Sequence, residues 1–175
     1  MRKLTLLLIG LALEGCASTV QQTDVGAPAA VSTGAGAGKA VVLNITGSTV
    51  ATTAKDWKDF KSLWPDACSQ EAAAAGASFS MQDGTPAPTG SDGTLVVLDV
   101  ADYRYVSAGA RFAFGIMTGN AFINAQATFR DLRSGDVRKT KAYDTTSTAW
   151  QGIFSGMTTK QVRAMCHEIF AEAGR

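Results

Sequence analysis

An alternation of apolar and polar residues dominates the middle of the chain and predicts long strands at 94–106, 120–132 and 137–146. In the first strand it separates Val96, Leu98 and Val100 from Asp99, Ala101 and Tyr103. In the second strand the apolar face consists of Ala121, Ile123, Ala125, Ala127 and Phe129, and the polar face of Asn124, Gln126, Thr128 and Arg130. A tight turn at Arg133–Asp136 makes the last two strands antiparallel neighbours.

Two shorter β-rich stretches, residues 39–46 and 77–81, predict further strands. Residues 82–93 are rich in Gly, Pro, Ser and Asp, which predicts a loop. Residues 107–119 combine Gly with aromatic residues and give no clear element. The chain therefore offers four to five strands.

Two helices are predicted from apolar residues spaced three and four apart. The first covers residues 53–68 and presents Ala54, Trp57, Phe60, Trp64 and Cys68, with Thr53 as its N-cap. Pro65 should kink or break this helix. The second covers 158–173, opens with a capping-box pattern at Thr158 and Gln161, and presents Val162, Met165, Cys166, Ile169, Phe170 and Ala173.

Together these elements predict an α+β fold: a two-layer sandwich with a mostly antiparallel sheet of four to five strands and two helices on one face. The alanines at 121, 125 and 127 would let a helix approach the sheet closely. The opposite face, with its polar residues, is then solvated or occupied by a partner.

The N-terminus carries the pattern of a bacterial lipoprotein signal. Basic Arg2 and Lys3 precede an apolar stretch over 4–13, which is shorter than the roughly 20 residues that a membrane-spanning helix needs. Leu13-Glu-Gly-Cys16 resembles the lipobox, with Glu14 where a small residue is usual. This resemblance implies that residues 1–15 are removed and that Cys16 is acylated. Ala17, which is not Asp, favours sorting to the outer membrane.

The segment after Cys16 is small, polar and rich in glycine. We expect residues 16–38 to form an acylated cysteine and a flexible tether with a reach of roughly 25 Å, followed by one globular domain over 39–175. With Cys16 acylated, Cys68 and Cys166 remain as an even pair in an oxidising compartment. They form either a disulfide or two buried free thiols.

At 127–135 the sequence Ala-Thr-Phe-Arg-Asp-Leu-Arg-Ser-Gly ends a strand with Asp131 before a Ser-Gly hairpin. The last helix opens with Thr-Thr-Lys-Gln-Val-Arg at 158–163. With the lipobox, these features resemble a family of small, uncharacterised bacterial lipoproteins of the domain-of-unknown-function type. The resemblance covers about residues 39–173, and the organisation is similar to periplasmic domains of the TolB N-terminal and curli-secretion lipoprotein kind. It implies an envelope protein without known catalytic residues.

Charge and motifs give no support for catalysis, a cofactor, a metal or a nucleic-acid partner. Lys and Arg total 16 against 15 Asp and Glu, so no basic stripe is available for phosphates. The glycine-rich run before Lys39 lacks the spacing of a phosphate loop, with Ala40 in place of Ser or Thr. His167 is the single histidine and is expected on the surface.

The same alternation suggests one binding face. Tyr103 and Tyr105 share a strand face, and we expect them to join Asn124, Gln126 and Arg130 as a polar, aromatic surface suited to protein or glycan contact. The sequence thus predicts a non-catalytic assembly or interaction module, lipid-anchored on the periplasmic face of the outer membrane, with another envelope protein as partner. The alternative is a lipoprotein that binds a small molecule or a glycan.

Overall fold

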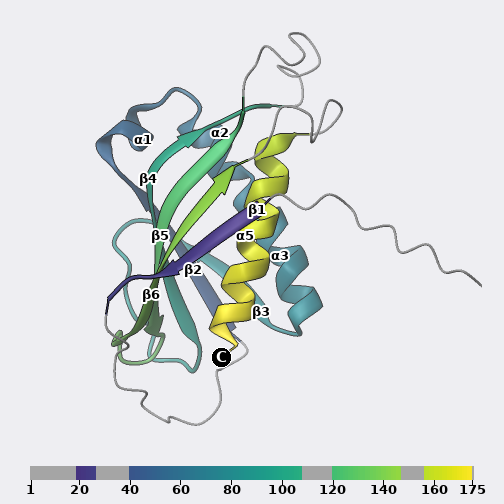
Figure 1. Cartoon of the computed structure of the whole chain (residues 1–175). Helices are drawn as coiled ribbons and strands as arrows, with labels where there is room; N and C mark the ends of the chain where they lie inside the picture. The colour runs from purple at the N-terminus through teal and green to yellow at the C-terminus, as the bar shows by residue number, and fades with distance from the viewer. Residues whose placement is uncertain (1–18, 27–39, 108–119, 147–155, 175) are drawn as a thin grey trace, which may run out of the picture.

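The computed structural model describes residues 19–26, 40–107, 120–146 and 156–174. In these residues six strands form one sheet in the order β1-β6-β5-β4-β2-β3 (Figure 1). The strands are β1 (Thr19–Asp24), β2 (Ala40–Gly47), β3 (Ser78–Gln82), β4 (Thr94–Arg104), β5 (Phe122–Asp131) and β6 (Val137–Thr146). The fold is α+β, as predicted.

The sheet is larger than the four to five strands expected, and it is only partly antiparallel. β2 runs parallel to both β3 and β4, whereas the pairs β4–β5, β5–β6 and β6–β1 are antiparallel. β2 and β3 can be parallel because the helices between them carry the chain back to the end of the sheet at which β2 begins.

The sixth strand, β1, comes from the segment that the sequence assigned to the tether. Thr19–Asp24 pairs with β6 from Thr146 to Lys141, so the prediction of a tether over 16–38 is wrong for these six residues. Residues 16–18 and 27–38 of the predicted tether lie outside the described residues.

The helices are α1 (Thr49–Thr53), α2 (Trp57–Ser62), α3 (Trp64–Ala75) and α5 (Met157–Ala173). The single helix predicted over 53–68 is therefore divided, and its cap is Ser48, whose Oγ accepts a hydrogen bond from the Ala51 N–H at 3.1 Å. Pro65 does break the helix: it lies in the first turn of α3, where its missing N–H costs nothing.

The start of α5 differs from the predicted capping box. Thr158 and Gln161 are buried and reach into the sheet layer. Thr158 Oγ1 accepts from the Val106 N–H at 2.9 Å, and Gln161 Nε2 donates to the Ala121 carbonyl at 2.8 Å. These two side chains fix the helix to the chain just after β4 and just before β5.

The core lies between one face of the sheet and the helix layer. Ala125 and Ala127 belong to the same buried cluster as Phe60 of α2, Trp64 of α3 and Met165 of α5. The prediction that helices cover the alanine-bearing face of β5 is confirmed. Figure 1 shows α5 running along the sheet with α3 beside it.

Candidate functional site

A β-bulge in β4 changes the predicted binding face. Val100 pairs with Ala125 and Asp102 pairs with Asn124, so Ala101 is an extra residue in this strand. An extra residue reverses the alternation of side chains beyond it. Tyr103 therefore lies on the side of the sheet that the helices cover, like its partner Ile123 in β5, and not on the side of Asn124.

Tyr103 and Tyr105 do not join the polar surface, and the prediction is wrong for both. Tyr103 is buried, its ring stacks on Phe60 with centroids 4.3 Å apart, and its hydroxyl donates to Asp56 Oδ1 at 2.5 Å. Burial, and next the hydrogen bond to Asp56, raise the pKa of Tyr103. Tyr105 is half-buried and packs against the same cluster, and burial likewise raises its pKa.

The polar face that remains, called the open face below, is lined by carboxylates and amides. One row crosses four strands through the pairs Asp102–Asn124, Asn124–Asp144 and Asp144–Gln21. A second row contains the pair Asp99–Gln126. All six of these side chains are exposed. Sequence reasoning found Asn124 and Gln126. It missed Asp102, Asp144 and Gln21, because only the bulge and the strand order bring them there.

Arg130 lies toward the other end of this face, opposite Leu95 and next to a second irregularity between Phe129 and Arg130. It is half-buried, and its Nε has no hydrogen-bond partner among the described residues. The five residues predicted for one surface are thus separated. Tyr103 and Tyr105 pack with the core, whereas Arg130 lies on the open face but at its hairpin end, away from Asn124 and Gln126.

The open face can offer hydrogen-bond acceptors and donors to a flat partner. Thr46 Oγ1 lies 3.2 Å from Asp99 Oδ1, and Asp102 Oδ1 accepts from the Tyr103 N–H at 2.8 Å. Among the described residues, no group of three or more His, Cys, Asp or Glu side chains is arranged to hold a metal ion.

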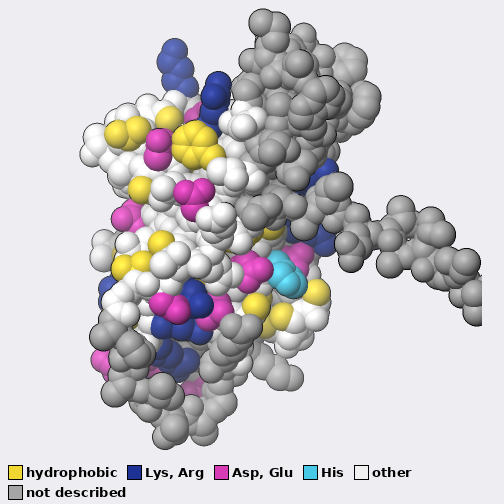
Figure 2. Space-filling view, viewed as in Figure 1, with side chains coloured by type: hydrophobic (Ala, Val, Ile, Leu, Met, Phe, Trp, Pro, Cys, Tyr) yellow, Lys and Arg dark blue, Asp and Glu magenta, His cyan; other side chains and the backbone are white. Residues whose placement is uncertain are grey.

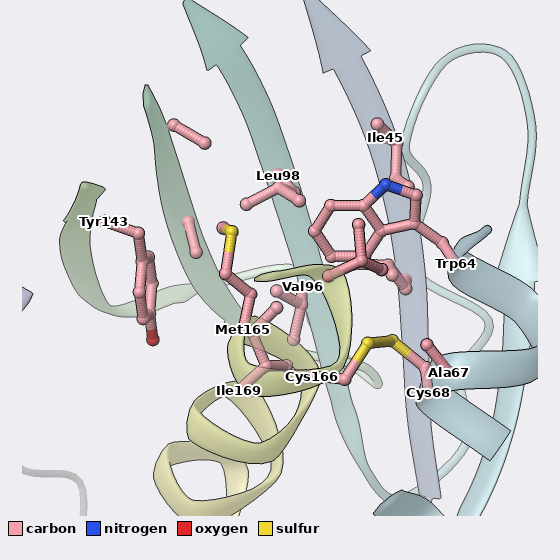
Figure 3. Close-up of a cluster of buried hydrophobic side chains, with 14 of the residues drawn as sticks. Ile45, Trp64, Ala67, Cys68, Val96, Leu98, Tyr143, Met165, Cys166 and Ile169 are labelled. Carbon is pink, nitrogen blue, oxygen red and sulfur yellow. A yellow bond between two sulfur atoms is a disulfide. The ribbon is translucent and has the colours of Figure 1, made fainter. Parts of the chain in front are cut away.

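On the covered side, Cys68 of α3 and Cys166 of α5 are joined in a disulfide with their Cα atoms 5.0 Å apart. The sequence allows either this disulfide or two buried free thiols, and the structure contains the disulfide. Both residues are fully buried, and Figure 3 shows the bond between the two helices, with Trp64 and Ala67 nearby. Neither sulfur is accessible as a nucleophile.

Next to the disulfide, Glu71 of α3 connects to two residues of α5. Its Oε1 accepts from Arg163 Nε at 2.8 Å, and its Oε2 lies 3.1 Å from His167 Nδ1. The hydrogen bond from Arg163 is the main reason that the pKa of Glu71 is lowered. His167 is on the surface, as predicted, and Figure 2 shows it beside acidic side chains.

A second ionic cluster lies where the end of α5 meets β6 and β1. Lys139 Nζ lies 2.8 Å from Glu172 Oε2, and Lys141 Nζ lies 3.3 Å from both Glu172 Oε1 and Asp24 Oδ1. Burial alone would raise the pKa of Glu172, but the hydrogen bonds and charges of the two lysines leave it lowered. This cluster links β1 to the helix layer.

Comparisons with known proteins give no family for this chain. No family model matches it, and no curated protein matches it. Among solved structures, the PelC dodecamer from Paraburkholderia phytofirmans in space group P6 is 15% identical, with 90% of this chain and 97% of that chain covered and a TM-score of 0.49. A single-substitution variant of that dodecamer in space group C2 is 14% identical, with the same coverage and TM-score. The similarity is too weak to transfer a function.

Proposed function

We propose that this protein is a lipoprotein anchored through acylated Cys16 to the periplasmic face of the outer membrane. Its domain would serve as a non-catalytic module for envelope assembly or protein interaction. The observation that carries the proposal is the buried Cys68–Cys166 disulfide, because such bonds persist in exported proteins and are rare in the reducing cytoplasm. It agrees with the lipobox at Leu13–Cys16.

The anchor in this proposal is the lipid on Cys16. In the parts of the chain that the structure describes, no helix is both long and apolar enough to cross a bilayer. One acyl chain holds a protein only marginally, whereas two or more hold it firmly. We therefore expect Cys16→Ser to release the protein from the membrane fraction, and mass spectrometry of the wild type to find acyl groups on an N-terminal Cys16. Membrane retention of Cys16→Ser would contradict the anchor.

The interaction role is assigned to the open face. Its exposed amides and carboxylates, Asn124, Gln126 and Asp144 among them, lie side by side on the face of the sheet that is turned away from the helices. The two tyrosines that favoured the alternative, a glycan or small-molecule binder, are turned to the other side of the sheet. The interaction module is therefore the proposal that the described residues support better.

A matched pair of substitutions tests this assignment. Gln126→Arg changes an exposed residue of the open face, and Gln70→Arg makes the same change on the exposed surface of α3. Cross-linking in intact cells, followed by purification, should give a specific envelope complex that Gln126→Arg loses and Gln70→Arg keeps. A complex that survives Gln126→Arg unchanged would remove the open face from the proposal.

A further inference from the structure

β1 occupies the stretch where the sequence predicted a spacer, and it is held firmly. All six of its residues pair with β6, and the Val25 N–H continues the ladder to the Thr140 carbonyl at 3.1 Å. On the covered side, Gln22 donates to a Glu168 carboxylate oxygen, and Asp24 pairs with Lys141. The sheet of the globular domain therefore includes residues from Thr19 onward.

The position of β1 leaves only a very short stretch of chain between the domain and the proposed lipid on Cys16. Only Ala17 and Ser18 separate Cys16 from Thr19, and three residue steps of fully extended chain span at most about 11 Å. A flexible tether over residues 17–38 would have reached roughly 25 Å. An acylated Cys16 must therefore keep the start of β1 beside the headgroups.

The register identifies what else lies at this level of the sheet. Thr19 pairs with Thr146, Thr146 with Phe122, and Phe122 with Arg104. We call these four residues the anchor corner. Phe122 is half-buried and Arg104 is exposed, and an exposed arginine suits the phosphate-bearing surface of a phospholipid leaflet.

We propose that the anchor corner rests on the phospholipid surface of the membrane, so that the domain is seated at the bilayer with its strands leading away from it. This inference rests on the proposed function, because it requires the lipid on Cys16. The opposite end of the sheet, where the Thr89 N–H donates to the Leu132 carbonyl, then projects into the periplasm. Ten residues of β5 separate the two ends by about 33 Å.

Two threonine-to-cysteine variants test the seating. Thr146→Cys lies in the anchor corner and Thr89→Cys at the far end, and both positions are exposed. The native cysteines do not compete for a thiol-reactive fluorophore, because Cys68 and Cys166 are bonded and Cys16 is acylated. The acylated full chain, purified from membranes, is inserted into phosphatidylethanolamine–phosphatidylglycerol vesicles that carry a nitroxide on the lipid headgroup.

We expect several-fold stronger quenching at position 146 than at position 89. Asp144→Cys, exposed on the same strand, is the second near position should a label at the strand end disturb the fold. The control inserts about 20 Gly and Ser residues between Ser18 and Thr19, which restores a reach of roughly 25 Å. The insertion should remove most of the difference between the two labels.

The outcomes separate this inference from the proposed function. Equal quenching at 146 and 89 in the chain without the insertion, with Cys16→Ser still released from membranes, would overturn the seating and leave the anchor intact. If Cys16→Ser stays membrane-bound, both the anchor and the seating fail. If the insertion leaves the difference unchanged, the short link is not what holds the corner at the surface, and the inference is wrong.

Discussion

On the covered side of the sheet, β4 and β5 present Val96, Leu98 and Ala127 to helices that are themselves joined by a disulfide. On the open face the same two strands present Asp99, Asn124 and Gln126 to solvent. The two sides share one backbone and one ladder of hydrogen bonds, but their side chains are constrained very differently. The free energy of unfolding should therefore depend mainly on residues of the covered side, whereas substitutions on the open face should change it little.

The largest expected effect comes from the disulfide. Replacing both Cys68 and Cys166 by Ala should lower the free energy of unfolding by about 4 kcal/mol, because the bond closes a loop with a sequence separation of 98 residues. Urea unfolding followed by far-UV circular dichroism measures the loss. Reductant should destabilise the wild type and leave the double variant unaffected; equal sensitivity of the two proteins would show that the bond contributes little.

Next comes the ionic cluster under the end of α5. Glu172→Gln should cost about 2 kcal/mol at neutral pH, because it removes a nearly buried carboxylate that pairs with Lys139 and Lys141 and leaves Lys141 with Asp24 alone. The lowered pKa of Glu172 gives the pH dependence: its contribution is complete above the ordinary value of 4.5 and is lost as pH falls below it. Chemical unfolding at a series of pH values should show wild type and variant converging in acid. A constant difference down to the lowest pH would contradict this assignment.

A smaller effect is expected from the hydroxyl of Tyr103. Tyr103→Phe keeps the stacking on Phe60 and removes the hydrogen bond to Asp56, which should cost about 1 kcal/mol. The control is a double-mutant cycle with Asp56→Asn, measured by thermal unfolding. Strict additivity of the two changes would mean that the hydroxyl and the carboxylate are not coupled.

The smallest effect should be found on the open face. Asp144→Asn makes the same acid-to-amide change as Glu172→Gln but on an exposed side chain, so its effect should stay within about 0.5 kcal/mol. Side-by-side urea unfolding of the two variants compares the two sides of the sheet directly. If Asp144→Asn lowered the free energy of unfolding as much as Glu172→Gln does, the two sides of the sheet would not differ in their contribution to stability.

Local patterns in the sequence were sufficient for the parts of the fold that local physics decides. The alternation in β5 predicted its covered and polar faces, the apolar stripe of 158–173 predicted α5, and Pro65 predicted the helix break. In each of these cases the burial of neighbouring side chains and the backbone preference point to the same answer.

The candidate site was predicted less well because it depends on pairings between distant strands. Nothing in the residues around Ala101 marks a bulge, so the alternation that holds through Val100 was extended to Tyr103 and placed it on the wrong side. β1 has a polar sequence without apolar alternation, and it becomes a strand because β6 offers an edge to pair with. The row Asp102–Asn124–Asp144–Gln21 could be predicted only from the bulge in β4 together with the pairing of β1 and β6.

β1 also has a consequence for the order of folding. It is the first described strand of the chain, yet its partner β6 is the last, and Cys68 likewise waits for Cys166 near the C-terminus. Contacts between residues so far apart in sequence form slowly, because the intervening chain must first be ordered. A chain emerging N-terminus first from a translocation pore would thus expose an unpaired β1 and an unbonded Cys68 until its final third has followed. The β1–β6 pairing and the disulfide therefore form only at the end of export.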